Sequence, residues 1–121
     1  MRIVNRKEFL TLPEGTLFQE GEPWVFGDLC VKHDSLIYGE DSDDYICQRP
    51  TNVEADSSEQ LFDRLDDMQQ NGASYPLDLG STERDGCFVR DAIYMIYEKA
   101  DITALRDLFI DLADGKIPDA D

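Results

Sequence analysis

The stretch Ala92–Glu98, which reads AIYMIYE, constrains the fold more than any other part of the chain. Its isoleucine and tyrosine residues favour β-sheets, and the run is typical of a central strand. Further strands are expected at residues 2–4, 16–18, 24–32, 35–39 and 44–48. Residues 74–79 are expected to form an edge strand, because Pro76 cannot donate to a sheet. Together these segments predict an antiparallel meander.

Capping signals predict a short helix near the N-terminus and a longer one in the middle of the chain. Asn5 and Glu8 have the spacing of a capping box. The second helix begins after Asp56 or Ser57 and ends at the Asn71-Gly72 pair, which favours a left-handed cap. Its apolar stripe has helical spacing and consists of Leu61, Leu65 and Met68.

A third helix is expected after Asp101, which would be its N-cap, and should end at Gly115. Its expected core face consists of Leu105, Leu108, Phe109 and Leu112. The chain of 121 residues fits one domain, residues 1–121, with a frayed tail from about residue 116. The sequence therefore predicts an α+β fold: a curved antiparallel sheet of five or six strands, two main helices and one short N-terminal helix.

The net charge of −16, from 27 acidic and 11 basic residues, excludes several kinds of partner. Nucleic acids and anionic membranes bind basic surfaces, so no direct nucleic-acid or membrane binding is expected. No apolar run approaches the length of a membrane span, and the N-terminus has no apolar signal region. The three cysteines contain no CxxC pair, which favours reduced thiols in a cytosol.

The acidic stretch GEDSDDY, residues 39–45, does not match a known metal loop or catalytic motif. A calcium loop that starts at Asp41 requires glycine at its sixth position and glutamate at its twelfth, but this chain has Ile46 and Asn52 there. Zinc is disfavoured because His33 is the only histidine. No metal, cofactor or enzymatic activity is therefore expected. The aromatic residues are expected to fill the core or, alternatively, to line a ligand pocket: Trp24, Phe26, Tyr94 and Tyr97.

Acidic residues are concentrated in residues 34–67, which hold eleven acidic and two basic side chains. Carboxylates three or four positions apart on a helix lie about 5–6 Å from each other. Such a row approximates the spacing of phosphates along one DNA strand, so it could compete for a basic cleft. The sequence predicts one partner-binding face, formed by Glu40, Asp41, Asp43, Asp44, Glu59, Asp63, Asp66 and Asp67. The alternative is a solvated face that keeps the protein soluble.

The opening IVNRKEFLTLPEGTLF, residues 3–18, resembles small accessory proteins of tailed phages and prophages. These share the pattern N-R-x-E-F-L-x-L-P-x-G-T, which carries no chemistry, so no functional residues transfer. The resemblance implies a context, because phage accessory proteins of this size often inhibit host machinery, including CRISPR effectors and restriction enzymes. It also implies the host cytoplasm as the location.

Three hypotheses remain open at this point. The first is a phage-type inhibitor that binds a host nucleic-acid-handling complex, such as a CRISPR effector, through its acidic face and blocks nucleic-acid access. The second is a sponge that sequesters a nucleotide immune signal, with Arg84, Arg90 and Arg106 as the candidate anion ligands. The third is a regulatory or structural phage protein. The oligomeric state is left open.

Overall fold

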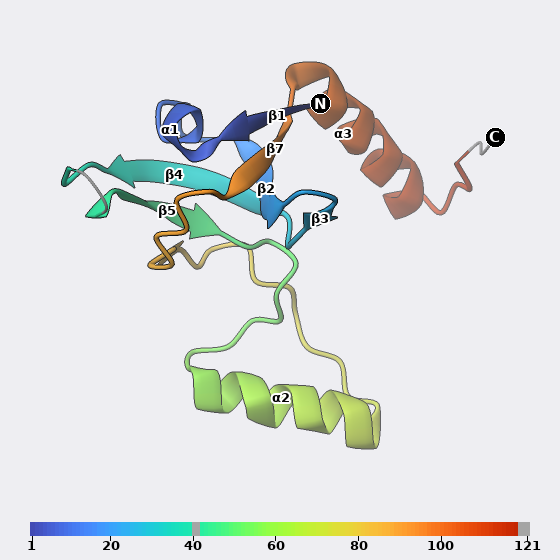
Figure 1. The fold of residues 1–121 in the computed structure, drawn as a ribbon. Helices are drawn as coiled ribbons and strands as arrows, with labels where there is room; N and C mark the ends of the chain where they lie inside the picture. Colours follow the sequence, from blue (N-terminus) through green and yellow to red (C-terminus); the bar gives the residue numbers. More distant parts are fainter. Residues whose placement is uncertain (40–41, 119–121) are drawn as a thin grey trace.

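In the part of the chain that the structure describes, a seven-stranded antiparallel sheet is combined with three helices, which confirms the predicted α+β class with one strand more than the five or six expected (Figure 1). The structure is a computed structural model and describes residues 1–39 and 42–118. The strands are ordered β1-β7-β2-β4-β5-β6, and β3 pairs with β2 outside this path. The strands are β1 (Arg2–Asn5), β2 (Leu17–Glu22), β3 (Val25–Phe26), β4 (Cys30–Leu36), β5 (Asp44–Gln48), β6 (Glu83–Arg84) and β7 (Ile93–Tyr97).

β7 is an interior strand, as predicted, and pairs with both β1 and β2. Tyr94 lies opposite Val4 on one side and Glu20 on the other. Alternate side chains point to opposite faces of a strand. Tyr94 and Ile96 are accordingly buried, while their neighbours on the other face are half-buried.

The segment 24–32, predicted as one strand, is confirmed only in part: Trp24 lies in a turn, and a break at residues 27–29 separates β3 from β4. Trp24 occupies the turn between β2 and β3 with a φ of 75°, a left-handed conformation that few residues other than glycine adopt. Its side chain is 97% exposed. β4 then begins at Cys30 and extends to Leu36. The predicted edge strand at 74–79 forms only an isolated bridge, between Leu77 and Val53.

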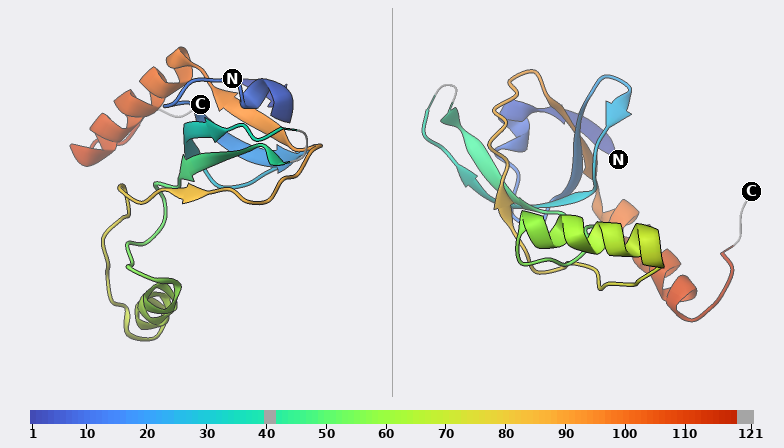
Figure 2. Two further views of the ribbon diagram at one scale, coloured as in Figure 1. Left: turned by 90° about the vertical axis from the view of Figure 1, so that its left-hand side faces the viewer. Right: turned by 90° about the horizontal axis from the view of Figure 1, so that it is seen from below.

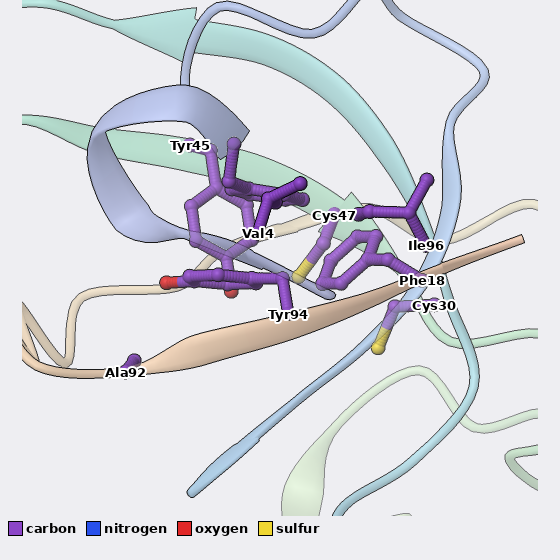
Figure 3. Packing of buried hydrophobic residues seen from close by; sticks show 9 residues of the cluster. Val4, Phe18, Cys30, Tyr45, Cys47, Ala92, Tyr94 and Ile96 are labelled. Atoms are coloured by element: carbon purple, nitrogen blue, oxygen red, sulfur yellow. The ribbon is translucent and has the colours of Figure 1, made fainter. Parts of the chain in front are cut away.

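The core lies between α1 (Arg6–Phe9) and one face of the curved sheet (Figure 3). Phe9 stacks on Tyr94 with ring centroids 4.0 Å apart and contacts Phe18 and Tyr45 edge-on or tilted. Offset and edge-to-face aromatic pairs add about 0.5–1.5 kcal/mol each beyond the burial of their area. The buried apolar residues are Val4, Phe9, Phe18, Cys30, Tyr45, Cys47, Ala92, Tyr94 and Ile96.

Local capping signals place two of the three helices correctly. The Asn5 side chain accepts a hydrogen bond from the Glu8 amide at 2.8 Å at the start of α1. The helix α2 (Ser58–Asn71) is capped by Ser57 and ends at Gly72 with a φ of 69°. The third helix, α3 (Lys99–Ala113), starts earlier than predicted. Glu98 is its N-cap, and Asp101 is the third helical residue, whose carboxylate accepts from the Glu98 amide.

Neither α2 nor α3 contains a buried residue, so the core face predicted for the third helix, at Leu105, Leu108, Phe109 and Leu112, is wrong. α2 lies apart from the sheet, connected to it by two long segments (Figures 1 and 2). These segments hydrogen-bond to each other, from the Glu54 amide to the Pro76 carbonyl at 2.9 Å and from the Asp78 amide to the Asn52 carbonyl at 2.8 Å. α2 is therefore an arm inserted between β5 and β6.

Candidate functional site

The apolar side of α2 is open to solvent. Phe62 and Leu65 are 65% and 42% exposed, and Leu61 and Met68 are only half-buried. Exposed apolar side chains grouped on one helix are typical of interaction sites. The predicted stripe is thus present, but Phe62 extends it, and the sheet does not cover it. Phe62 directly follows Leu61, so the broadening of the stripe was visible in the sequence.

Three carboxylates on α2 are free to meet a partner. Glu59, Asp63 and Asp66 are exposed and form no hydrogen bond or ion pair with any residue that the structure describes. Asp67 differs, because it accepts hydrogen bonds from Asn71 at 2.8 Å and from the Tyr75 hydroxyl at 2.5 Å. The Tyr75 hydroxyl, and after it the Asn71 amide, lower the pKa of Asp67. Asp67 therefore fastens α2 to the segment that follows it.

The carboxylates of the acidic turn that the structure describes are used within the protein. Asp43 Oδ1 accepts hydrogen bonds from the backbone amides of Tyr38 and Gly39, both at 2.7 Å. The Asp44 side chain is fully buried and accepts from Arg84 Nε at 2.6 Å and from the Gly86 amide at 3.0 Å. Glu40 and Asp41 lie outside the described residues.

The acidic turn and α2 belong to different ends of the molecule. Asp44 begins β5, whereas α2 is connected beyond Gln48, at the other end of that strand. The ribbon views show α2 well away from the β4–β5 turn (Figures 1 and 2). The structure therefore does not bring Asp43 and Asp44 onto the same surface as Asp63 and Asp66.

A buried polar network joins α1, β5, β7 and the loop before β7. Arg6 Nη1 donates to the Tyr94 hydroxyl at 2.6 Å, and Nη2 donates to the Asp43 carbonyl at 2.9 Å. The same guanidinium lies 3.9 Å from Asp44 and 4.0 Å from Asp85. Sequence reasoning did not find this network, because its members are separated by up to 88 residues. Because these contacts all lie within the protein, we interpret the network as one that stabilises the fold.

Burial changes the acidity of the groups in this network. The Tyr45 hydroxyl donates to Glu20 Oε2 at 2.9 Å. Burial raises the pKa of Glu20; the hydrogen bond from Tyr45 opposes the shift, and the nearby Asp85 adds to it. Burial also disfavours the charged form of Asp44, but hydrogen bonds from Arg84 and the backbone outweigh it, and the pKa of Asp44 is lowered.

The remaining candidate residues do not converge on one reactive centre. His33 Nε2 lies 3.2 Å from Gln48 Oε1. In residues 1–39 and 42–118, no group of three or more His, Cys, Asp or Glu side chains could hold a metal. Tyr94 fills the core, whereas Trp24 projects into solvent. Cys30 and Cys47 are buried, Cys87 is exposed, and all three thiols are free.

Comparison with known proteins does not identify the chain. No family model matches it, and neither a curated protein nor a solved structure does. In the part of the chain that the structure describes, no helix is both long and apolar enough to cross a membrane.

Proposed function

We infer that the protein is an interaction module that inserts α2 into a basic groove of another protein. The observation that carries this function is the arm itself: α2 lies apart from the sheet with no buried residue. A helix of 14 residues gains little stability from its own hydrogen bonds, and packing normally supplies the rest. A partner that covers Phe62 and Leu65 would provide this packing, and because both are already partly covered, each would contribute less than the roughly 1.5–3 kcal/mol of a fully exposed side chain.

The charge of the arm defines the chemistry of that partner. With 3.6 residues per turn, Glu59 and Asp66 lie beside Phe62 at one edge of the apolar stripe, and Asp63 lies on the opposite face of the helix. Arg64 is the only basic side chain on the helix. Arg64 is occupied, since its Nη1 donates to the Glu54 carbonyl at 2.5 Å and its guanidinium lies 4.8 Å from the centre of the Tyr75 ring. An apolar groove with a lysine- or arginine-rich rim therefore complements α2.

Basic grooves of this kind are typical of proteins that handle nucleic acids. The proposed consequence of docking is that α2 occupies the groove and excludes the nucleic acid, so the protein acts as an inhibitor without chemistry of its own. A host nucleic-acid-handling complex, such as a CRISPR effector, belongs to this partner class. The exposed apolar stripe favours this proposal over a purely solubilising role, because solubility requires no Phe62 on the surface.

The test starts by capturing host complexes on the immobilised protein and identifying those that bind nucleic acid. Displacement of fluorescent DNA or RNA from each captured complex is then measured. The variant Phe62→Ala/Leu65→Ala should raise the concentration needed for half displacement at least tenfold. Asp63→Asn/Asp66→Asn should slow association and flatten its dependence on salt.

The matched control is Asp91→Asn/Asp107→Asn, which removes two exposed carboxylates outside α2. This control should displace nucleic acid as the unmodified protein does. Equal displacement by all variants, or capture of no nucleic-acid-binding complex, would refute the proposed function.

A further inference from the structure

We propose that two copies of this chain pair through α3, with the two helices side by side and antiparallel. α3 leaves the sheet at the end of β7 and projects away from it (Figures 1 and 2). None of its 15 residues is buried. The proposed function uses α2 alone, so this surface is separate from it.

One row of apolar side chains follows the length of α3. The row has the alternating three- and four-residue steps of a coiled-coil seam and consists of Ile102, Leu105, Phe109 and Leu112. Leu105 is half-buried, whereas Ile102 is 42% exposed, Phe109 57% and Leu112 52%. Exposed apolar side chains grouped in this way are typical of an interaction surface.

The row is self-complementary in an antiparallel pair. When Ile102 of one copy lies opposite Leu112 of the other, Leu105 lies opposite Phe109. The two-fold axis of such a pair then repeats both contacts. Because the steps are the same when read from either end of the helix, a second copy offers the surface that fits this row.

The low charge of α3 permits a second acidic chain to approach it. From Lys99 to Ala113 the helix holds two basic and three acidic side chains, which leaves a net charge of −1. α2 holds one basic and four acidic side chains, which leaves −3. Of the two helices with open apolar sides, α3 therefore suits a copy of this acidic chain, whereas α2 suits a basic partner.

The last turn of α3 favours the antiparallel orientation. It contains Asp111 and is followed by Asp114, with no basic residue, at the negative end of the helix dipole. Neither side chain forms a hydrogen bond or an ion pair with any residue that the structure describes. A parallel copy would bring four such carboxylates together, which would be repulsive.

The first turn of α3 is the better neighbour for these carboxylates. The Met1 ammonium lies 3.2 Å from Glu98 and 2.9 Å from Asp101, and with Lys99 it balances their charge. What remains at this end is the positive pole of the helix dipole. An antiparallel copy places that pole beside Asp111 and Asp114 at both ends of the pair.

A hollow at the start of α3 gives the tail of the second copy a place to bind. The hollow measures about 510 Å³, and its apolar lining includes Leu12, Ile96 and Ile102. The antiparallel arrangement brings Ile117 of the second copy to this end of the helix pair. Ile117 is 94% exposed in the single chain, and binding in the hollow would cover it.

The size of the contact sets its expected strength. α3 is about 22 Å long, and a pair of helices of this length buries less than the roughly 800 Å² per partner of a standard interface. The dimer should therefore be weak and should form only at high protein concentration.

Sedimentation equilibrium of the full chain tests the proposal, over a range from about 1 μM to about 500 μM. The average mass should rise from that of one chain towards that of two. Added salt should move this rise to lower concentration, because it screens the repulsion between two chains of net charge −16. Docking of α2 on a basic groove has the opposite salt dependence, so the two contacts are distinguishable.

Leu112→Ala and Ile110→Ala form a matched pair of variants. Both side chains are 52% exposed, but Leu112 belongs to the apolar row and Ile110 lies on another side of the helix. Leu112→Ala should weaken dimerisation at least tenfold, whereas Ile110→Ala should leave it nearly unchanged. Since neither residue is buried and alanine favours helices, both variants should keep the melting temperature of the dilute protein within a few degrees.

Disulfide cross-linking tests the orientation, in chains that carry Cys87→Ser to remove the exposed thiol. A mixture of an Ile102→Cys chain and a Leu112→Cys chain should form covalent dimers under mild oxidation. Each of these chains alone should form few. Cross-linking of the Ile102→Cys chain with itself as readily as in the mixture would overturn the antiparallel pair.

Three further outcomes would overturn the proposal. One is a mass that stays at that of one chain at every protein and salt concentration. Another is equal weakening by Leu112→Ala and Ile110→Ala. The third is loss of dimerisation in Phe62→Ala/Leu65→Ala, which should dimerise as the unmodified protein does. Because these tests measure mass and those of the proposed function measure displacement of nucleic acid, failure of one proposal leaves the other standing.

Discussion

Arg6 and Tyr94 are joined by a hydrogen bond of 2.6 Å between Nη1 and the phenolic oxygen, across 88 residues of chain. Arg6 is 8% exposed and Tyr94 is fully buried. The bond ties α1 to the interior strand β7, beside the stacked rings of Phe9 and Tyr94. α1 has only four residues, so these tertiary contacts hold it in place.

Tyr94→Phe should lower the free energy of unfolding by about 1–3 kcal/mol, because it keeps the stacked ring and leaves a buried donor of Arg6 without its partner. Urea denaturation at pH 7 measures the change. Tyr97→Phe is the matched control, since it removes a hydroxyl that donates to Gln19 at 2.7 Å in a half-buried position. The prediction is contradicted if Tyr94→Phe lowers the free energy of unfolding by no more than Tyr97→Phe does.

Asp44→Asn should cost about 3 kcal/mol at pH 7, because it removes a buried charge that Arg84 and the Gly86 amide bind. The folded pKa of Asp44 is lowered, so its contribution is present above the ordinary Asp pKa of about 3.9 and is lost as pH falls towards the folded value. The difference in the free energy of unfolding between Asp44→Asn and the unmodified protein should therefore become smaller below pH 4.

Denaturant titrations at pH 3 and pH 7 check this narrowing. Asp107→Asn serves as the control, because Asp107 pairs with Arg106 on the surface of α3. Exposed pairs contribute about 0–1 kcal/mol, so this variant should unfold close to the unmodified protein at both pH values. If the difference in unfolding free energy between Asp44→Asn and the unmodified protein is the same at pH 3 and pH 7, the charge of Asp44 is not the source of its contribution to stability.

Glu20→Gln should stabilise the protein at pH 8 and much less at pH 4. Burial first, and Asp85 also, raise the pKa of Glu20, while the Tyr45 hydroxyl and Arg6 lower it in part. An acid with a raised folded pKa destabilises the fold as pH rises from the ordinary Glu value of about 4.3 through the folded pKa. Glutamine keeps an acceptor for Tyr45 and removes the charge.

Thermal unfolding at pH 4 and pH 8 measures this difference. Glu22→Gln is the matched control: it removes one negative charge at an exposed position of the same strand, so it measures the effect of lowering the net charge alone. The prediction fails if the two variants change the melting temperature equally at pH 8.

Cys87 should be the one thiol that reacts quickly with Ellman's reagent in the folded protein at pH 8. Cys30 and Cys47 are buried, and burial raises the pKa of Cys30 to about 11. Asp85, and after it burial, raise the pKa of Cys87, so its reaction should be slower than that of free cysteine. Cys87→Ser should abolish the fast phase, and urea should expose the two remaining thiols. A fast phase that survives in Cys87→Ser would contradict the burial of the other two.

Elements with local signals were predictable from the sequence. The caps at Asn5, Ser57 and Gly72 depend on side chains within four residues, and the β-favouring run at 92–98 identifies its own strand. The turn at Trp24 was not predictable, because its left-handed backbone position normally holds glycine or asparagine, whereas tryptophan favours strands.

Features that depend on distant partners were not predictable. Helical periodicity identifies an apolar face but not what covers it. The face at Leu105 and Leu108 was therefore expected to pack on the core, although α3 holds no buried residue. The burial of Asp44 depends on Arg84, 40 residues away, and no spacing rule connects them. The docking role of Asp63 and Asp66 stays a prediction, now argued from α2 alone.

The two ends of the α2 arm meet where Asn52 and Glu54 bond to Asp78 and Pro76. β5 and β6 pair directly beside this junction, so the sheet does not need the arm to complete its register. We therefore expect that residues 55–75 can be replaced by another helix or a short turn without altering the core. If α2 binds the partner as we propose, replacing this one segment would change the partner while the sheet and its core stay the same.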